Sequence, residues 1–193
     1  MKDGKIWSGS DGILGADDRA GVAVVLKLAQ YLYTQSIFNG KVKFIFTVEE
    51  EIGLLGAKNV DEHFLWGIDA AFVIDRRGTS DIVTHNWSMK FCSEEFGGFV
   101  EEMAKQSNLV GWKCTRGGSS DTRIWAEHGI QSVNLSAGYW NEHTERECLD
   151  VDASFNVTTL LKKVFERSNE MRRVFLNRDN RGRVKGKIRV VNK

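Results

Sequence analysis

Short apolar runs alternate with longer stretches of helical spacing along this chain. The runs are rich in β-branched and aromatic residues, and they predict strands over residues 41–48 (KVKFIFTV), 70–75 (AAFVID) and 131–136 (QSVNLS). Apolar positions with helical spacing predict helices over residues 18–33, 94–106, 121–127 and 152–175. This alternation is typical of crossover units, in which helices cover both faces of a mainly parallel sheet.

We therefore expect an α/β fold with three layers (α/β/α), in which a mixed, mostly parallel sheet lies between helices. No linker or repeat divides the chain. We therefore expect a single catalytic domain over residues 1–176, without a lid domain. Residues 177–193 are basic, and both a late edge strand and a loose tail fit their sequence.

The composition is that of an ordinary globular domain, with 41% hydrophobic and 27% charged residues among 193. No apolar stretch approaches the length of a transmembrane helix, and the first residues lack the apolar core of a signal peptide. The three cysteines follow no metal-binding or disulfide pattern. We therefore expect a cytoplasmic protein with reduced thiols and no membrane partner.

The charge is distributed unevenly along the chain. The net charge is +1, yet residues 162–193 contain twelve Lys or Arg residues and three acidic ones. A basic segment of this kind can bind nucleic acid. Aromatic residues do not alternate with the basic ones, as stacking on bases would require. A solvated helix face is the favoured interpretation, and we expect no nucleic-acid partner.

Acidic residues and one histidine lie where the predicted strands end or a helix begins. Glu50 and Glu51 follow the first strand, and Asp75 ends the second. His143 follows the third strand, and Asp17 lies at the entry to the first helix. Ligands of open α/β sheets bind beyond the carboxyl ends of the strands. We therefore expect these side chains to converge on one cation.

A hydrolytic site with two metal ions needs a carboxylate that bridges the ions and further carboxylate or imidazole ligands for each of them. It also needs a carboxylate that does not bind metal and that takes a proton from the attacking water. Neighbouring residues at a strand end point in different directions. Glu51 can therefore face the metal while Glu50 faces the substrate.

Four segments resemble the motifs of the di-zinc exopeptidase clan, which includes peptidase T, the tetrahedral aminopeptidases and enzymes similar to glutamate carboxypeptidase. LGADDRAGVAVVLKL resembles the motif with the bridging aspartate, and TVEEEIGLLGAK resembles the Glu-Glu motif. VIDRRG is similar to the strand that ends in a metal-binding aspartate. GGSSDTRIWAEHGIQSVNLSAGYWNEHTERECLDVD resembles the C-terminal block, which ends near a histidine and a glutamate. Together the segments span residues 14–152 in the order of the clan.

The resemblance implies a role for each matching residue. Asp17 would bridge both metals, Glu51 and His143 would complete one metal site, and Asp75 would belong to the other. Glu50 would be the general base that acts on a metal-activated water. The implied cofactor is zinc, as one or two divalent ions.

The same resemblance implies that Asp121 and Tyr139 contact the substrate, which would be a peptide or a similar amide. The implied activity is metal-dependent hydrolysis that removes one terminal residue, and aminopeptidase is favoured over carboxypeptidase. A homo-oligomer or a complementing chain is the expected protein partner.

The sequence departs from the clan at its beginning. The clan carries a His-x-Asp pair upstream of the bridging aspartate, but no histidine precedes Asp17 here. The second zinc ion would have only Asp17 and Asp75 as ligands, and His85 is a minor candidate for a substitute. The catalytic domain is thus expected to be incomplete at its N-terminus. A truncated fragment, a subunit completed by another chain, and a catalytically incomplete remnant that binds a partner all remain open.

Each candidate residue also has a purely structural interpretation. Asp17 and Asp121 suit helix N-termini, where acidic side chains are favourable. Asp75 suits an ion pair with Arg76 or Arg77. The combination of motifs favours the metal site over these alternatives.

Overall fold

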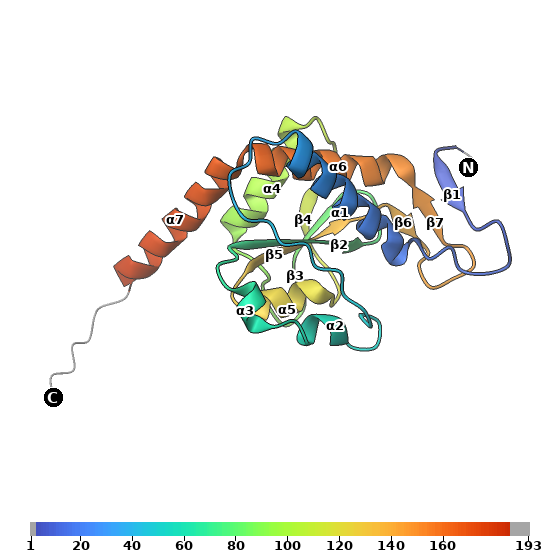
Figure 1. Cartoon of the computed structure of the whole chain (residues 1–193), viewed down its shortest axis with the longest axis horizontal. Helices are drawn as coiled ribbons and strands as arrows, with labels where there is room; N and C mark the ends of the chain where they lie inside the picture. The colour runs from blue at the N-terminus through green and yellow to red at the C-terminus, as the bar shows by residue number, and fades with distance from the viewer. Residues whose placement is uncertain (1–2, 186–193) are drawn as a thin grey trace.

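The computed structural model describes residues 3–185 of the chain, with side chains to residue 176, and its centre is a four-stranded sheet (Figure 1). The strand order is β2-β5-β3-β4. The bounds are Ala70–Arg76 for β2, Asp81–His85 for β3, Lys113–Arg116 for β4 and Gln131–Ser136 for β5. The β2–β5 and β3–β4 pairs are parallel and the β3–β5 pair is antiparallel, which confirms the predicted mixed, mostly parallel sheet.

Helices cover both faces of this sheet and give the predicted three layers (Figure 1). One face carries α1 (Ala16–Thr34), α4 (Glu94–Gln106) and α6 (Val151–Glu166), and it contains the larger hydrophobic cluster, around Phe96, Leu135 and Leu160. The other face carries α2 (Leu55–Lys58), α3 (Glu62–Leu65) and α5 (Asp121–Glu127) over a smaller cluster. The core is therefore divided by the sheet.

A second, antiparallel sheet lies beside the first and has the order β1-β7-β6. It consists of β1 (Lys5–Trp7), β6 (Tyr139–Trp140) and β7 (Cys148–Asp150). The β6–β7 pair closes the loop of residues 141–147, which carries His143. Asp150 also begins α6, since its side chain accepts a hydrogen bond from the backbone N–H of Ala153.

The prediction of a strand over residues 41–48 is wrong. The segment is assigned no strand, although exposed and partly buried residues alternate along it from Lys43 to Val48. Val42 packs against the larger core cluster and Ile45 against the smaller one, so the segment lies along the sheet. The side-chain pattern was predicted correctly, but a strand also requires a ladder of backbone hydrogen bonds, and the structure describes none here.

The predicted closing helix also differs from the structure. It breaks near Arg167, where α6 ends and α7 (Ser168–Lys185) begins. Residues 177–185 continue α7 and form no strand, while residues 186–193 lie outside the described residues. None of the helices that the structure describes is long and apolar enough to cross a membrane.

Gly21 lets α1 approach β2 closely. A Cβ atom at this position would lie 2.0 Å from the carbonyl oxygen of Ile74 and 2.3 Å from Oδ2 of Asp18. The first of these atoms belongs to the backbone of β2 and cannot rotate away. This contact holds the start of α1 against the end of β2, where the candidate acids lie.

Gly21→Ala is therefore expected to destabilise the fold by about 1–3 kcal/mol, the usual cost of overpacking. The midpoint of urea unfolding measures this change. Gly98→Ala is the matched control, because Gly98 lies in α4 with no atom within 4 Å of an added Cβ. The control should gain about 0.5–1 kcal/mol from helix propensity. Equal stability of the two variants would contradict the close contact at Gly21.

Candidate metal centre

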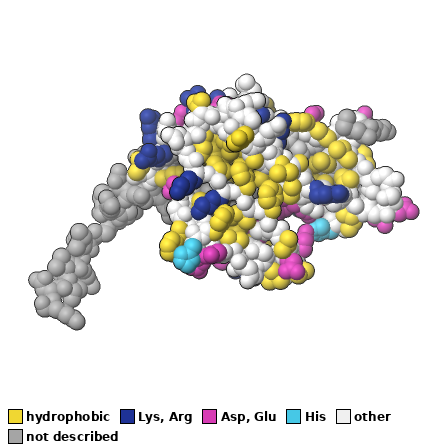
Figure 2. Space-filling model, viewed as in Figure 1, with side chains coloured by type: hydrophobic (Ala, Val, Ile, Leu, Met, Phe, Trp, Pro, Cys, Tyr) yellow, Lys and Arg dark blue, Asp and Glu magenta, His cyan; other side chains and the backbone are white. Residues whose placement is uncertain are grey.

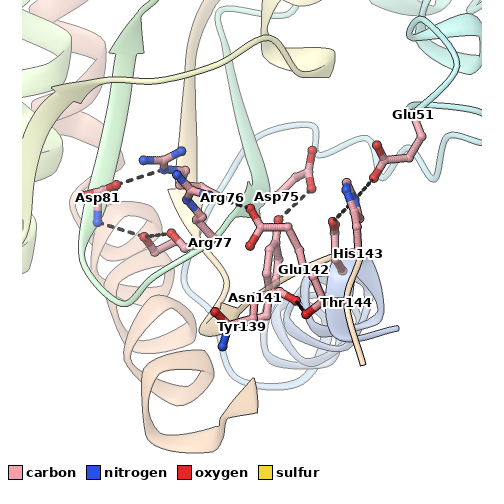
Figure 3. Close-up of polar contacts among 12 residues, drawn as sticks. Glu51, Asp75, Arg76, Arg77, Asp81, Tyr139, Asn141, Glu142, His143 and Thr144 are labelled. Atoms are coloured by element: carbon pink, nitrogen blue, oxygen red, sulfur yellow. Dashed lines mark hydrogen bonds and ion pairs between the residues drawn. The ribbon is translucent and has the colours of Figure 1, made fainter. Parts of the chain in front are cut away.

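Four separate segments bring the candidate ligands to one end of the main sheet. Asp75 is the penultimate residue of β2, and Asp17 lies in the first turn of α1. Glu51 lies in the turn before α2, and His143 lies in the loop between β6 and β7. Figure 3 shows Glu51, Asp75 and His143 around a common space.

His143, Glu51 and Asp17 form the first group. Nε2 of His143 lies 2.6 Å from Oε1 of Glu51 and 3.0 Å from Oδ2 of Asp17. One ligand atom from each of the three side chains lies within 4.8 Å of the other two. Ligand atoms around a tetrahedral zinc ion are separated by roughly 3–3.5 Å, given Zn–N and Zn–O bonds of about 2.0–2.2 Å. The group therefore fits one zinc ion after small movements.

Asp17, Asp18 and Asp75 form the second group, in which the ligand atoms again lie within 4.8 Å of one another. Asp17 belongs to both groups, as a bridging ligand would. Oδ1 of Asp18 accepts a hydrogen bond from the backbone N–H of Gly21 at 3.0 Å. The hydroxyl of Tyr139 donates to Oδ1 of Asp75 at 3.2 Å (Figure 3).

Burial and mutual repulsion keep protons on these acids. Burial, followed by the charge of Asp75, raises the pKa of Asp18 from 3.8 to about 9. Burial, followed by the charge of Glu50, raises the pKa of Asp75 from 3.8 to about 8. The pKa of Asp17 is raised by burial and then by Glu51. Carboxylates packed in this way are stabilised by a bound cation, which would restore their charged forms.

Glu50 lies beside these groups but belongs to neither of them. Burial is the main cause that raises its pKa to about 7, and the charges of Glu51 and Asp121 add to the effect. A carboxyl group that titrates near neutral pH can both accept and return a proton. Its environment therefore suits the role of general base that the sequence resemblance implies.

The arginines after β2 do not neutralise Asp75. Nε of Arg76 lies 2.9 Å from Oδ2 of Asp81, and an Nη atom of Arg77 lies 3.0 Å from Oε1 of Glu142. Figure 3 shows Arg76 directed toward Asp81, away from Asp75, and Arg77 directed toward Glu142. The structural alternative for Asp75, an ion pair with Arg76 or Arg77, is thus absent among the described contacts. The carboxyl group of Asp75 stays available for a ligand.

Asp121 lies at the start of α5, outside both ligand groups. The helix is capped by Ser120, whose hydroxyl accepts a hydrogen bond from the N–H of Thr122. Asp121 is therefore not the cap that the sequence also allowed. Its Oδ2 accepts a hydrogen bond from the hydroxyl of Thr47 at 2.5 Å, and its buried Oδ1 has no partner among the described residues.

Two residues that organise the site were not identified from the sequence. Glu147 is fully buried and accepts hydrogen bonds from the N–H groups of Gly15 and Asp17. Asn134 of β5 bonds both the N–H and the C=O of Asp75. Glu147 thus holds the backbone at the start of α1, and Asn134 holds the backbone near the end of β2. Glu147 stands in a run of charged residues, and nothing in that run distinguishes it from its exposed neighbours.

The remaining histidines, His63, His85 and His128, belong to neither group of candidate ligands among the described residues. Nδ1 of His85 lies 3.1 Å from the hydroxyl of Thr84 on β3. The structure thus gives no support to His85 as a substitute ligand. The second group consists of carboxylates alone, a donor set that suits a harder ion than zinc. The ligand roles of Asp17, Glu51, Asp75 and His143 remain predictions.

Comparison with known proteins supports a peptidase fold. A family model described as M42 glutamyl aminopeptidase matches residues 13–160. Peptidase T of Salmonella arizonae is 36% identical over 76 residues, which cover 39% of this chain and 18% of the relative. The matched stretch is thus a small part of that longer protein.

Solved structures give a consistent result. Aminopeptidase PepT from Bacillus cereus superimposes with a TM-score of 0.69 at 21% identity, covering 86% of this chain and 74% of that chain. The Pyrococcus horikoshii TET1 peptidase superimposes with a TM-score of 0.64 at 25% identity, covering 83% and 52%. The latter is described as assembling into a tetrahedron or a large octahedral shell. These structures confirm the fold that the motifs implied.

Glu147→Gln is expected to weaken both the fold and metal binding. An amide has one acceptor oxygen in place of two, so the N–H of Gly15 or of Asp17 loses its partner. An unpaired buried group costs about 1–3 kcal/mol, and a change in such a supporting residue lowers metal affinity about 10- to 100-fold. Urea unfolding and zinc titration calorimetry measure the two effects. Glu145→Gln, at an exposed neighbouring position, should change stability by less than about 0.5 kcal/mol.

The metal-free chain is expected to lose stability as the pH rises from about 5 to 9. Folding raises the pKa values of Asp18 and Asp75 from 3.8 to about 9 and about 8, so the folded chain binds more protons than the unfolded chain across this range. Stability falls with pH wherever the folded state holds the extra protons. Urea midpoints of the chelator-treated chain measure the trend. Asp18→Asn should flatten it, and a midpoint that rises between pH 5 and 8 would contradict the buried acid cluster.

Proposed function

Because the chain belongs to the M42 glutamyl aminopeptidase family, we propose that it is a metal-dependent exopeptidase that removes an N-terminal residue from peptides. The observation that carries the proposal is the convergence of Asp17, Glu51 and His143 within 4.8 Å, with Glu50 beside them. These residues come from three separate segments of the chain. Asp17 is also within ligand distance of Asp18 and Asp75, so the convergence brings more acids together than the single imidazole of His143 can neutralise.

In this proposal Asp17, Glu51 and His143 hold a zinc ion, and Asp17, Asp18 and Asp75 hold a second divalent ion when it is present. Bound ions supply Lewis acidity, which acidifies water and polarises the scissile carbonyl. Tyr139 orients Asp75 through its hydroxyl, and Glu147 orients Asp17 through the backbone. The first site has a nitrogen ligand and the second has only oxygen ligands, so we expect zinc to bind the first site more tightly.

Glu50 is the general base in this proposal. It accepts a proton from the attacking water and passes that proton to the leaving amine. Its pKa, raised to about 7 mainly by burial, suits both transfers at neutral pH. The hydroxyl of Tyr139 contacts Asp75, and the charge of Asp121 acts on both Glu50 and Asp75, so we propose that Asp121 and Tyr139 contact the substrate. The three free cysteines support a reducing, cytoplasmic location.

One observation favours a second candidate function. The segment of residues 41–48 makes no backbone ladder, and Phe46 and Val48 on it are 52% and 69% exposed. Such an edge is suited to binding another polypeptide. The second candidate is therefore a catalytically incomplete subunit that binds a partner chain, which supplies the metal ligand that the clan carries before the bridging aspartate.

Glu50→Gln tests the proposed enzyme. Loss of a general base typically lowers the rate 10²- to 10⁴-fold, so hydrolysis of an aminoacyl anilide should fall by about this factor. Zinc stoichiometry, measured on the same samples, should stay unchanged because Glu50 lies outside both ligand groups. His143→Ala should lower zinc stoichiometry as well as activity.

Glu49→Gln is the matched control, since Glu49 is exposed and adjacent to Glu50. It should change neither zinc content nor turnover. Zinc binding with the same hydrolysis rate in the wild type and in Glu50→Gln would contradict the role of Glu50. A purified chain with no zinc and no turnover that depends on Glu50 would favour the second candidate.

A further inference from the structure

The loop between β6 and β7 holds His143 in a backbone conformation that few side chains favour. The φ angle of His143 is 63°, and that of Asn141 is 56°. This left-handed region costs an ordinary residue free energy, although Asn tolerates it better than most. The side chain of His143 is also 60% exposed, so packing against a core does not fix it. Contacts with other segments are therefore needed to hold this residue.

Hydrogen bonds within the loop shape it into a turn but do not attach it to the rest of the fold. The hydroxyl of Thr144 donates to the carbonyl of Asn141 at 2.7 Å and accepts from the N–H of Arg146 at 3.2 Å. The N–H of Glu147 donates to the carbonyl of Thr144 at 3.0 Å. A turn built in this way can move as a unit about its ends. The position of His143 therefore depends on where the turn is anchored.

Two acids anchor the turn, one on each side of His143. Glu147, four residues after His143, binds the backbone at the start of α1. Glu142, directly before His143, forms an ion pair with Arg77, in which Nη1 lies 3.0 Å from Oε1 (Figure 3). The side chain of Glu142 is 21% exposed, against 56% for that of Arg77. Among the described contacts, this ion pair attaches the part of the turn that precedes His143.

Arg77 is a firm anchor because its own backbone is tied to the centre of the fold. Its carbonyl accepts a hydrogen bond from the hydroxyl of Ser136, the last residue of β5, at 3.1 Å. The N–H of the next residue, Gly78, donates to the carbonyl of Tyr139 at 2.9 Å. Arg77 also follows Asp75 by two residues on the same stretch of backbone. The ion pair thus links the segment that carries one candidate ligand to the turn that carries another.

A neighbouring ion pair of the same kind does not reach the turn. Nε of Arg76 lies 2.9 Å from Oδ2 of Asp81, the first residue of β3. The two arginines are adjacent in the sequence, and each pairs with a partly exposed acid. Arg76 connects β2 with β3, whereas Arg77 connects the end of β2 with the residue before His143. The pair of Arg76 and Asp81 therefore serves as an internal standard for a purely structural ion pair.

We propose that Arg77 is a positioning residue of the metal centre, which holds His143 in place through the carboxylate of Glu142. The inference rests on the proposed function, because it takes His143, Asp17 and Glu51 as ligands of one ion. Glu142 belongs to neither candidate ligand group, and its carboxylate binds the arginine. The apparent affinity of a site falls with the fraction of molecules in the binding-competent arrangement. Loss of the ion pair therefore weakens metal binding without removing a ligand.

Zinc titration calorimetry of the full chain tests the proposal. Glu142→Gln and Arg77→Ala should each raise the zinc dissociation constant at least about fivefold, because the turn then spends more time in other positions. Arg77→Lys, which keeps the positive charge, should recover part of the loss. The double variant should bind zinc no more weakly than either single variant, since both remove the same contact. Asp81→Asn is the matched control, because it breaks the neighbouring ion pair and should leave the dissociation constant unchanged.

Hydrogen exchange of the metal-free chain separates this inference from the proposed function. The amides of residues 141–147 should exchange faster in Glu142→Gln than in the wild type, while those of β5 should not change. A wild type that binds no zinc would contradict the proposed function, and exchange would still decide whether Arg77 anchors the turn. Unchanged exchange in residues 141–147, or unchanged zinc affinity in Glu142→Gln, would overturn the role of Arg77. Losses that add in the double variant, or an equal loss in Asp81→Asn, would overturn it as well.

Discussion

The repulsion between carboxylates at one end of the main sheet constrains the rest of the structure. Asp17, Asp18 and Asp75 are brought within 4.8 Å, and burial together with neighbouring acids raises the pKa values of all three. The fold holds them with neutral donors, such as the hydroxyl of Tyr139 and the N–H of Gly21. Such donors orient the acids but carry no net charge. A bound cation would remove the repulsion, so the cost of this cluster to the metal-free fold is the strongest physical argument for a metal centre.

The two ligand groups differ in chemistry because they differ in the segments that build them. The loop between β6 and β7 brings an imidazole to Asp17 and Glu51, and this mixed set suits zinc. The second group is built by α1 and β2 alone, and neither of these elements contributes a nitrogen or sulfur ligand. Asp18, which the sequence interpretation did not assign to metal, gives the second group a third carboxylate. The two candidate groups thus differ in donor chemistry, and the all-carboxylate group has one donor more than the sequence interpretation assigned to it.

Much of the fold follows from local patterns, and the remainder depends on contacts that one sequence does not display. The bounds of α4, α5 and β5 agree with the predicted ranges because their apolar spacing is regular and their ends carry clear signals, such as the capping Ser93. The strands β3 and β4 were not predicted. They have five and four residues and contain few apolar side chains, so their sequences show only a weak strand pattern. The rule for strand ends places Asp75 correctly at the end of β2, whereas Glu50 and Glu51 follow a segment that forms no strand. It had no means to identify Glu147, whose partners are backbone amides far away in the sequence.

The segment of residues 41–48 shows how the missing strand and the candidate site are connected. It has the side-chain pattern of a strand but makes no ladder of backbone hydrogen bonds with another described strand. The turn that carries Glu50 and Glu51 is held by backbone hydrogen bonds to the start of α2 and by side-chain contacts with other segments. The hydroxyl of Thr47 donates to Asp121, and His143 bonds Glu51. The positions of Glu50 and Glu51 therefore depend on contacts with the start of α2, with α5 and with the loop between β6 and β7 rather than on a strand.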